Sequence, residues 1–159
     1  MADLFTLAGI LALVHGFFGL VFLVSFSGCI AVLLNFAKRS LKTLKMFVRG
    51  MTISIWVTSF SGLITYIFYR APGAESAKNR LLAGDFPWLH NVVFEFKEHV
   101  GMFPPVIMLV ATVFVWHYGD SVFTDKKTRN MLLGLLTLSF LITLLVFGLG
   151  AMVTKVESV

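Results

Sequence analysis

Residues 4–37 read LFTLAGILALVHGFFGLVFLVSFSGCIAVLLNFA and contain no charged side chain. A helix that crosses a bilayer needs about 20 consecutive apolar residues. This run exceeds that length, so we expect the helix to tilt in the bilayer or to project from it at one end. The run is also much longer than the apolar core of a secretory signal peptide, and we therefore expect it to belong to the mature protein.

Three more predicted spans follow, at residues 46–69, 88–117 and 131–153, and the fully apolar part of the span 88–117 begins at Val100. Of the 159 residues, 58% are hydrophobic and only 13% are charged, whereas about a quarter of the residues in a soluble domain carry a charge. We find no internal repeat and no low-complexity tract. The sequence therefore predicts an all-α integral membrane protein, a single four-helix transmembrane bundle over residues 1–159 in a lipid bilayer.

The loop between the second and third runs carries helix signals of its own. The stretch APGAESAKNRLLAG, residues 71–84, predicts a short surface helix that ends at Gly84. Asp85 and Pro87 then suit the start of a third long helix. We expect Pro104 and Pro105 to kink that helix, because proline lacks an amide hydrogen and crowds the preceding turn.

Basic residues gather at the connections between the first and second runs and between the third and fourth. Eight of the 13 lysine and arginine residues lie there, namely Lys38, Arg39, Lys42, Lys45, Arg49, Lys126, Lys127 and Arg129. An excess of lysine and arginine marks the cytoplasmic side of a membrane protein. Both termini and the loop of residues 70–90 would then face the outer side, as in a multi-pass protein of the bacterial inner membrane.

Several classes of function are disfavoured. The net charge of +5 is not gathered into a basic face with interleaved aromatic residues, so we expect no nucleic-acid partner. No apolar run carries a carboxylate near its centre, which disfavours ion pumps, and no nucleotide-binding or metallohydrolase motif is present. Cys29 is the only cysteine, which excludes an internal disulfide and cysteine-ligated clusters. Whether the chain is an enzyme stays open, and an electron-transfer subunit fits better than a self-contained enzyme.

Two histidines lie at a similar depth on the predicted outer side. His15 is inside the first apolar run, and His99 opens the apolar part of the third. Imidazoles from two separate membrane helices can hold a haem iron as its two axial ligands. Gly16 and Gly19 would leave space beside His15. The alternative is that both histidines only form hydrogen bonds and that the glycines let helices pack closely.

Charged residues near His99 suggest supporting roles. Glu95 lies four residues before His99, on the same helical face, and its carboxylate could accept the second ring N–H of a metal-bound His99. Arg70, at the outer end of the second run, is a candidate partner for haem propionates. Two alternatives stay open: a solvated ion-pair cluster of Glu95 and Glu98 with Lys97 or Arg70, and a small non-haem metal site formed by Glu95, His99 and His15.

The remaining histidines are less probable iron ligands. His90 and His99 are nine residues apart, so on a regular α-helix they would point to opposite faces. His117 shares a face with His99 but has no second histidine to pair with. Thr58, Ser61, Gly62 and Thr65 form a row of small and polar residues in the second run, which indicates either a helix seam or a ligand groove.

The arrangement of four spans with His15 and His99 at one depth resembles the four-helix membrane b-type cytochrome subunits. This resemblance implies haem b, with His15 and His99 as axial ligands, and electron transfer between a membrane quinone and a partner redox protein. It also implies partner membrane subunits. Two other interpretations remain: a redox-inert accessory or assembly subunit, and a haem-free membrane protein that binds a quinone or another small ligand.

Overall fold

The computed structural model describes residues 7–35, 39–73 and 76–156. These residues form helices and no strands. The elements are α1 (Leu7–Leu33), α2 (Leu41–Tyr69), α3 (Ala77–Ala83), the π-helix η1 (Leu89–Phe94), α4 (Glu95–Val100), α5 (Phe103–Tyr118), α6 (Ser121–Thr124) and α7 (Lys126–Val156).

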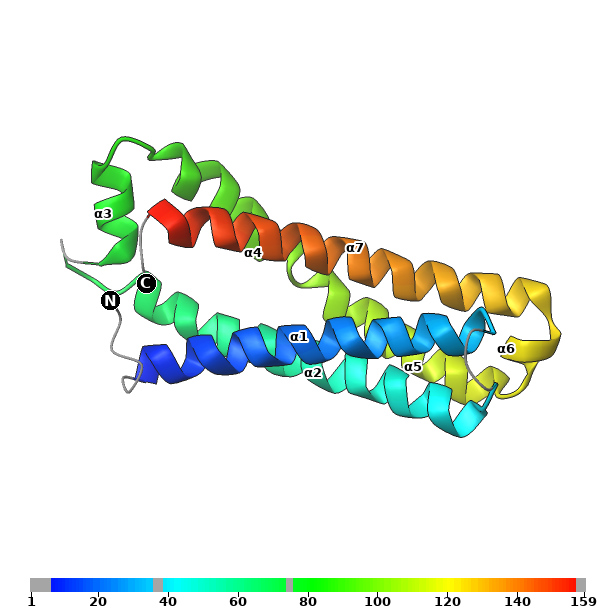
Figure 1. Cartoon of the computed structure of the whole chain (residues 1–159). Coiled ribbons are helices and arrows are strands. Elements are labelled where there is room, and N and C mark those ends of the chain that lie inside the picture. The colour runs from blue at the N-terminus through cyan, green and yellow to red at the C-terminus, as the bar shows by residue number, and fades with distance from the viewer. Residues whose placement is uncertain (1–6, 36–38, 74–75, 157–159) are drawn as a thin grey trace.

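Four stretches are long and apolar enough to cross a membrane, namely Gly9–Leu33, Leu41–Tyr69, Leu89–Tyr118 and Lys126–Val153. They run alternately up and down an elongated bundle, in which α2 packs against α1 and α5, and α7 packs against α5 (Figure 1). The start of α1, the end of α2 and α3 lie at one end, which we call the α3 end. The end of α1, the start of α2 and α6 lie at the other, the α6 end. The predicted all-α, four-helix membrane architecture is therefore confirmed.

Two of the helices begin earlier than the apolar pattern predicts. Ser40 caps α2, since its hydroxyl accepts a hydrogen bond from the Thr43 amide at 3.3 Å. Asp125 does the same for α7, with its carboxylate accepting from the Thr128 amide at 2.9 Å. The basic residues from Lys42 to Arg49 and from Lys126 to Arg129 thus lie in helical turns rather than in loops. Lys38 and both ends of the predicted run 4–37 lie outside the described residues.

The third span is built from consecutive segments. It begins as the π-helix η1, continues as α4, and is interrupted at Gly101 and Met102 before α5. Pro104 and Pro105 occupy the first turn of α5, where a missing amide hydrogen costs least. The expected break near the prolines is present. The short helix α3 also forms as predicted, capped by Ser76 and ending at Gly84.

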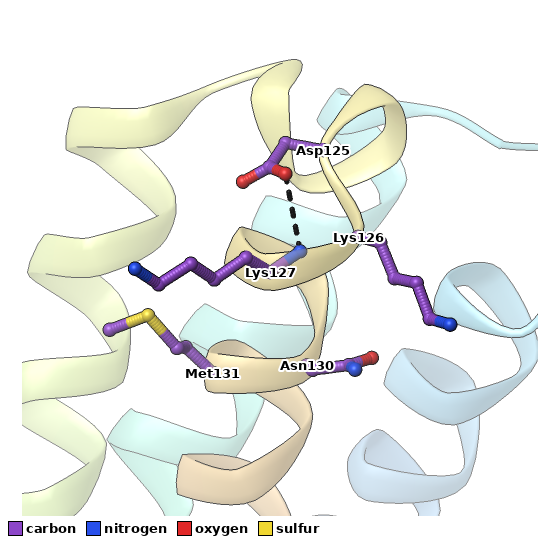
Figure 2. Close-up of a pocket in the computed structure, with 5 residues that line it drawn as sticks. All are labelled: Asp125, Lys126, Lys127, Asn130 and Met131. Atoms are coloured by element: carbon purple, nitrogen blue, oxygen red, sulfur yellow. Dashed lines mark hydrogen bonds between the residues drawn. The ribbon is translucent and has the colours of Figure 1, made fainter.

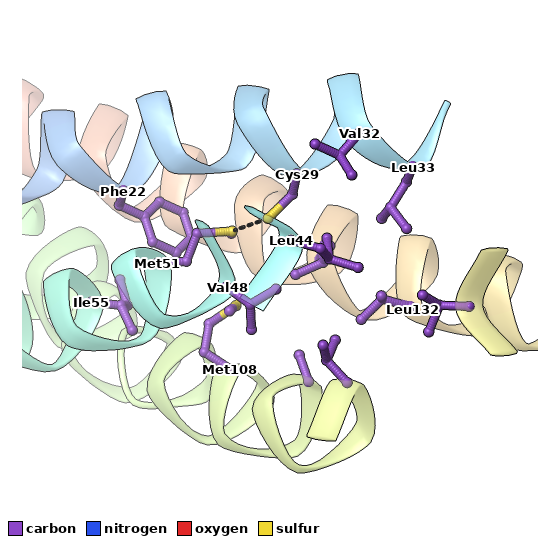
Figure 3. Packing of buried hydrophobic residues seen from close by; sticks show 14 residues of the cluster. Phe22, Cys29, Val32, Leu33, Leu44, Val48, Met51, Ile55, Met108 and Leu132 are labelled. Carbon is purple, nitrogen blue, oxygen red and sulfur yellow. Dashed lines mark hydrogen bonds between the residues drawn. The ribbon is translucent and has the colours of Figure 1, made fainter. Parts of the chain in front are cut away.

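The main core fills the α6 half of the bundle. Figure 3 shows α1 and α2 meeting there through Phe22, Cys29 and Met51, with the Cys29 Sγ 3.8 Å from the Met51 Sδ. Side chains of α5, α6 and α7 close the cluster, among them Met108, Val122, Leu132 and Leu136. All of these are completely buried. Helices in a bilayer associate mainly through close packing, because lipid tails are as apolar as these side chains, so this tightly packed half holds the bundle together.

A second, smaller cluster closes the α3 end. It joins the last turn of α2 to α3, η1 and the end of α7, through Tyr69, Ala77, Leu81, Leu89, Val93, Phe94 and Val153. The Tyr69 and Phe94 rings stack with centroids 4.1 Å apart. We call this group the end cluster.

Between the two clusters, the side chains on the inward faces of α2 and α7 become smaller and more polar. Residues spaced alternately four and three apart share one helical face. On α2 that row reads Leu, Val, Met, Ile in the main core and then Thr, Gly, Thr before Tyr69 (residues 44, 48, 51, 55, 58, 62 and 65). On α7 it reads Leu, Leu and then Ser, Thr, Val, Gly (residues 132, 136, 139, 143, 146 and 150). We call this stretch, residues 58–65 of α2 and 139–150 of α7, the polar section. Figure 1 shows α1 and α7 diverging along it toward the α3 end.

Candidate functional site

His15 lies at the level of the polar section and faces the bundle. It is seven residues before Phe22 and fourteen before Cys29, both completely buried, so the three share one face of α1. Its Nδ1 is 2.9 Å from the carbonyl oxygen of Thr58, and the Ser61 hydroxyl is 3.5 Å away. At Gly62 a Cβ would lie only 3.2 Å from the His15 Cε1, so the glycine admits the ring. His15 therefore packs against the row of small and polar residues in α2.

This contact fixes the protonation of the His15 ring. A carbonyl oxygen only accepts, so Nδ1 must carry the hydrogen that it donates to Thr58. In a neutral imidazole Nε2 then has a free lone pair. Among the described residues no hydrogen bond reaches Nε2. A histidine that binds a metal through Nε2 commonly donates Nδ1–H to a backbone carbonyl in this way.

His99 has the same ring arrangement but a different position. Its Nδ1 donates to the carbonyl oxygen of Glu95 at 2.7 Å, one turn earlier in the same helical stretch. The side chain is exposed, as are Met102, Phe103 and Val106, which lie on the same face three, four and seven residues later. His99 thus has a free Nε2, on a face that the described helices leave uncovered.

Lys97, not His99, is the α4 residue that lies against α7. A Cβ at Gly150 of α7 would be 3.4 Å from the Lys97 Cε. The Lys97 Nζ lies 4.8 Å from the centre of the Phe94 ring and 3.5 Å from the Glu98 carboxylate. Residues two apart in an α-helix point to nearly opposite sides. The structure therefore directs His99 away from α7 and does not bring it into contact with His15.

Glu95 and Arg70 form an ion pair across the α3 end. The Arg70 guanidinium also lies over the Tyr66 ring, 4.8 Å from its centre. Glu95 does support His99, but through its main-chain oxygen, because its carboxylate is turned toward Arg70. The Glu95 carboxylate therefore does not bond the His99 ring in this arrangement, and its role beside a metal-bound His99 stays a prediction. The solvated ion-pair cluster, left open as an alternative, is the arrangement observed.

His90 is a buried, hydrogen-bonded residue whose position the sequence spacing did not indicate. It is only 4% exposed and lies against the end cluster, where its Nδ1 is 2.9 Å from the Tyr69 hydroxyl. Its Nε2 is 3.7 Å from the Glu95 carboxylate, which in turn forms the ion pair with Arg70. A polar chain thus runs from a buried tyrosine to the surface. It sits on a π-helical segment, a distortion frequent at functional sites.

The α6 end offers different chemistry. His117 is exposed there, its ring 4.9 Å from that of Tyr118. Figure 2 shows an open pocket at the start of α7, lined by Asp125, Lys126, Lys127, Asn130 and Met131. No group of three or more histidine, cysteine, aspartate or glutamate residues within residues 7–35, 39–73 and 76–156 is placed to hold a metal ion. The non-haem site of Glu95, His99 and His15, left open as an alternative, is thus not assembled in this part of the chain.

Three buried polar atoms lie near the boundary of the main core and the polar section. They are the Trp56 Nε1, the Thr58 Oγ1 and the Ser139 Oγ, and none has a hydrogen-bond partner in the described part of the chain. A buried donor without a partner costs about 1–3 kcal/mol. Such atoms are usually satisfied by ordered water or by a ligand.

Comparison of the chain with protein-family models, with curated proteins and with solved structures found no match.

Proposed function

We propose that the protein is an integral-membrane electron-transfer subunit that binds haem b in the α3 half of the bundle. His15 would be one axial ligand and His99 the other. The observation that supports this best is the shared state of their rings, in which Nδ1–H is donated to a backbone carbonyl and Nε2 is free. Haem b, when bound, would supply one-electron transfer with a quinone or a partner redox protein.

The residues around His15 fit a flat, apolar group. A Cβ at Gly16 or Gly19 would meet no atom within 4 Å, so α1 leaves space directly after His15 and one turn later. The polar section presents small side chains where the main core has leucine and methionine. Arg70 has further N–H donors besides the one paired with Glu95, and these suit a propionate.

His99 has to change its direction for this role. The break at Gly101 and Met102 separates α4 from the firmly packed α5, so a turn of α4 about its axis would leave the main core in place. The same turn would part Lys97 from Gly150 and the Glu95 carboxylate from Arg70, because α4 carries both contacts. Such a turn would bring Nε2 of His99 inward while its bond to Glu95, which lies within the same helical stretch, is kept. The two ligands thus differ: His15 is held in place by α2, and His99 requires rearrangement.

An absorption spectrum of the purified protein tests the proposal. We expect a Soret band and a reduced α-band of b type, lost in His15→Ala and in His99→Ala. His117→Ala is the matched control, because it removes an exposed imidazole at the opposite end. A colourless, folded preparation would contradict haem binding and favour a redox-inert accessory subunit. Loss in His15→Ala with retention in His99→Ala would contradict His99 as the second ligand.

A second candidate function is haem-free quinone binding in the polar section. It is favoured by the single inward imidazole, because the free Nε2 of His15 can accept a hydrogen bond from a quinol hydroxyl. The hydroxyls of Thr58 and Ser139 have no partner among the described residues and can donate to a quinone carbonyl. Quinone that co-purifies with the wild-type protein and is lost in His15→Gln, without any haem spectrum, would establish this alternative.

Orientation and location form part of the proposal. By the positive-inside rule, the basic residues of α2 and α7 favour an orientation in which the α6 end is cytoplasmic. The α3 end, with His15, His99 and the end cluster, then faces outward, as expected for a protein of the bacterial inner membrane. Cysteine labelling at an exposed residue of each end, for example Asn79 and Lys127, checks this assignment.

A further inference from the structure

An apolar groove follows the outer face of α5 toward the α6 end. Its volume is about 380 Å³, and it is lined by Leu109, Val110, Val113, Phe114, His117 and Tyr118. Aliphatic residues form one end, and the His117 and Tyr118 rings form the other. From Leu109 to Tyr118 the helix rises about 14 Å at 1.5 Å per residue. This length matches one leaflet of a hydrocarbon core that is about 30 Å thick.

Two cations of α2 are held beside the aromatic end of this groove. The Lys45 Nζ lies 5.1 Å and the Arg49 Cζ 5.6 Å from the centre of the Trp116 ring. Trp116 is three residues after Val113 and seven after Leu109, so it borders the groove on the same face of α5. A tryptophan that is 39% exposed and carries two cations is typical of the level of lipid headgroups.

The surroundings have an excess of positive charge. Among the described residues of the α6 end, the basic ones are Arg39, Lys42, Lys45, Arg49, Lys126, Lys127 and Arg129, and the acidic ones are Asp120 and Asp125. Lys45 and Arg49 have no carboxylate among their described contacts. The charge that would complement this pair is therefore anionic.

We propose that the α5 groove and the Lys45–Arg49–Trp116 cluster form a binding site for an anionic phospholipid. An acyl chain lies along Leu109, Val113 and Phe114, and the phosphate is bound by Lys45 and Arg49 at the depth of Trp116. A zwitterionic lipid also covers the groove but gains less from the two cations. This site differs from the other lipid-facing surfaces of the helices because it combines a groove about as long as one leaflet with two cations, Lys45 and Arg49, held at its end.

Quenching of Trp116 fluorescence by brominated lipids tests this site. The chain has three tryptophans, so Trp56→Phe and Trp88→Phe leave Trp116 as the only one. The protein is placed in phosphatidylcholine vesicles that contain equal fractions of brominated phosphatidylglycerol or brominated phosphatidylcholine. One basic residue near a membrane surface contributes about a fivefold preference for anionic lipid, so we expect at least that preference at Trp116.

Matched variants separate the site from general surface charge. Lys45→Gln with Arg49→Gln should bring the preference close to one, whereas Lys126→Gln with Lys127→Gln, at the same end of the bundle, should leave it unchanged. Equal quenching by the two lipids, or an equal loss in both variant pairs, overturns the proposal. If the double tryptophan variant does not fold, native mass spectrometry of the wild-type protein counts the retained lipids. Retention of both lipids in equal number would then overturn it.

Discussion

The Tyr69 hydroxyl and the His90 Nδ1 lie 2.9 Å apart, and this bond joins the last turn of α2 to the π-helix η1. Tyr69 is 1% exposed and His90 is 4% exposed, so neither group has water as a ready substitute. The Phe94 ring, stacked on Tyr69, covers the pair from one side. The bond therefore ties the second span to the third at the α3 end, where the helices otherwise diverge.

Tyr69→Phe should destabilise the protein. It removes the hydroxyl but keeps the ring stacked on Phe94, and it leaves a buried ring nitrogen of His90 without a partner. The expected loss is about 1–3 kcal/mol of unfolding free energy, measured by denaturant titration in detergent. Tyr118→Phe serves as the control, since Tyr118 is 42% exposed. Equal stability of both variants would show that the Tyr69 hydroxyl contributes nothing to the end cluster.

The contact between His15 and Gly62 gives a second prediction. In Gly62→Ala the new methyl group would lie 3.2 Å from the His15 Cε1, so the ring must shift by a few tenths of an ångström. Loss of support for a ligating histidine typically weakens metal affinity by about tenfold or more, and we expect a fall of that size in haem affinity, measured by titration of the apoprotein. Gly148→Ala is the control, because its Cβ would meet no atom within 4 Å. Unchanged affinity in Gly62→Ala would argue against His15 as a ligand.

Sequence periodicity predicted the architecture well, for physical reasons. Four long, mainly apolar runs have few solutions other than membrane helices. Gly84 as the end of α3 and the break before Pro104 also follow from local backbone chemistry. The helix starts were less accurate, because Ser40 and Asp125 extend α2 and α7 into charged sequence that an apolar pattern does not register.

The candidate site was predicted only in part. Depth along a helix can be counted from the sequence, and the inward position of His15 follows from its spacing to Phe22 and Cys29. The direction of His99 depends on which face of α4 packs against α7, and that is decided by Lys97 and Gly150. The direction of His90 could not be predicted from its spacing to His99, because that spacing assumes a regular α-helix. Leu89–Phe94 is a π-helix, which has more residues per turn. A tyrosine at the end of the inward row of α2, Tyr69, was the feature of the sequence that could have indicated a buried polar partner such as His90.

A third prediction concerns the contact between α1 and α2. A Cβ at Gly28 would lie 2.5 Å from the Phe47 ring, so Gly28→Ala forces that ring or the two helices apart. We expect a loss of about 1–3 kcal/mol, the usual cost of overpacking. Gly134→Ala adds the same methyl group where nothing lies within 4 Å, and it should gain up to about 1 kcal/mol from helix propensity. Thermal unfolding that shows both variants shifted in the same direction would contradict close packing at Gly28.

The last prediction is a pH dependence at the start of α7. Asp125 has extended backbone geometry and accepts hydrogen bonds from the Thr128 hydroxyl and from the Thr128 and Lys127 amides. These bonds, with the Thr128 hydroxyl the largest contributor, lower the pKa of the Asp125 carboxyl below its ordinary value. A carboxyl whose pKa is lowered in the folded state stabilises that state above its unfolded pKa of about 3.9, and this stabilisation is lost as the pH falls through the lower, folded value.

The first turn of α7 should therefore open in acid, below about pH 4, while the main core stays closed. Hydrogen exchange at the Lys127 and Thr128 amides measures this opening. Asparagine caps a helix about as well as aspartate but does not titrate, so Asp125→Asn should keep the protection at neutral pH and lose the acid dependence. Asp125→Ala should lose protection at every pH. Asp120→Asn is the control, because the Asp120 side chain makes no capping hydrogen bond. Acid-dependent exchange that persists in Asp125→Asn would assign the effect to another group.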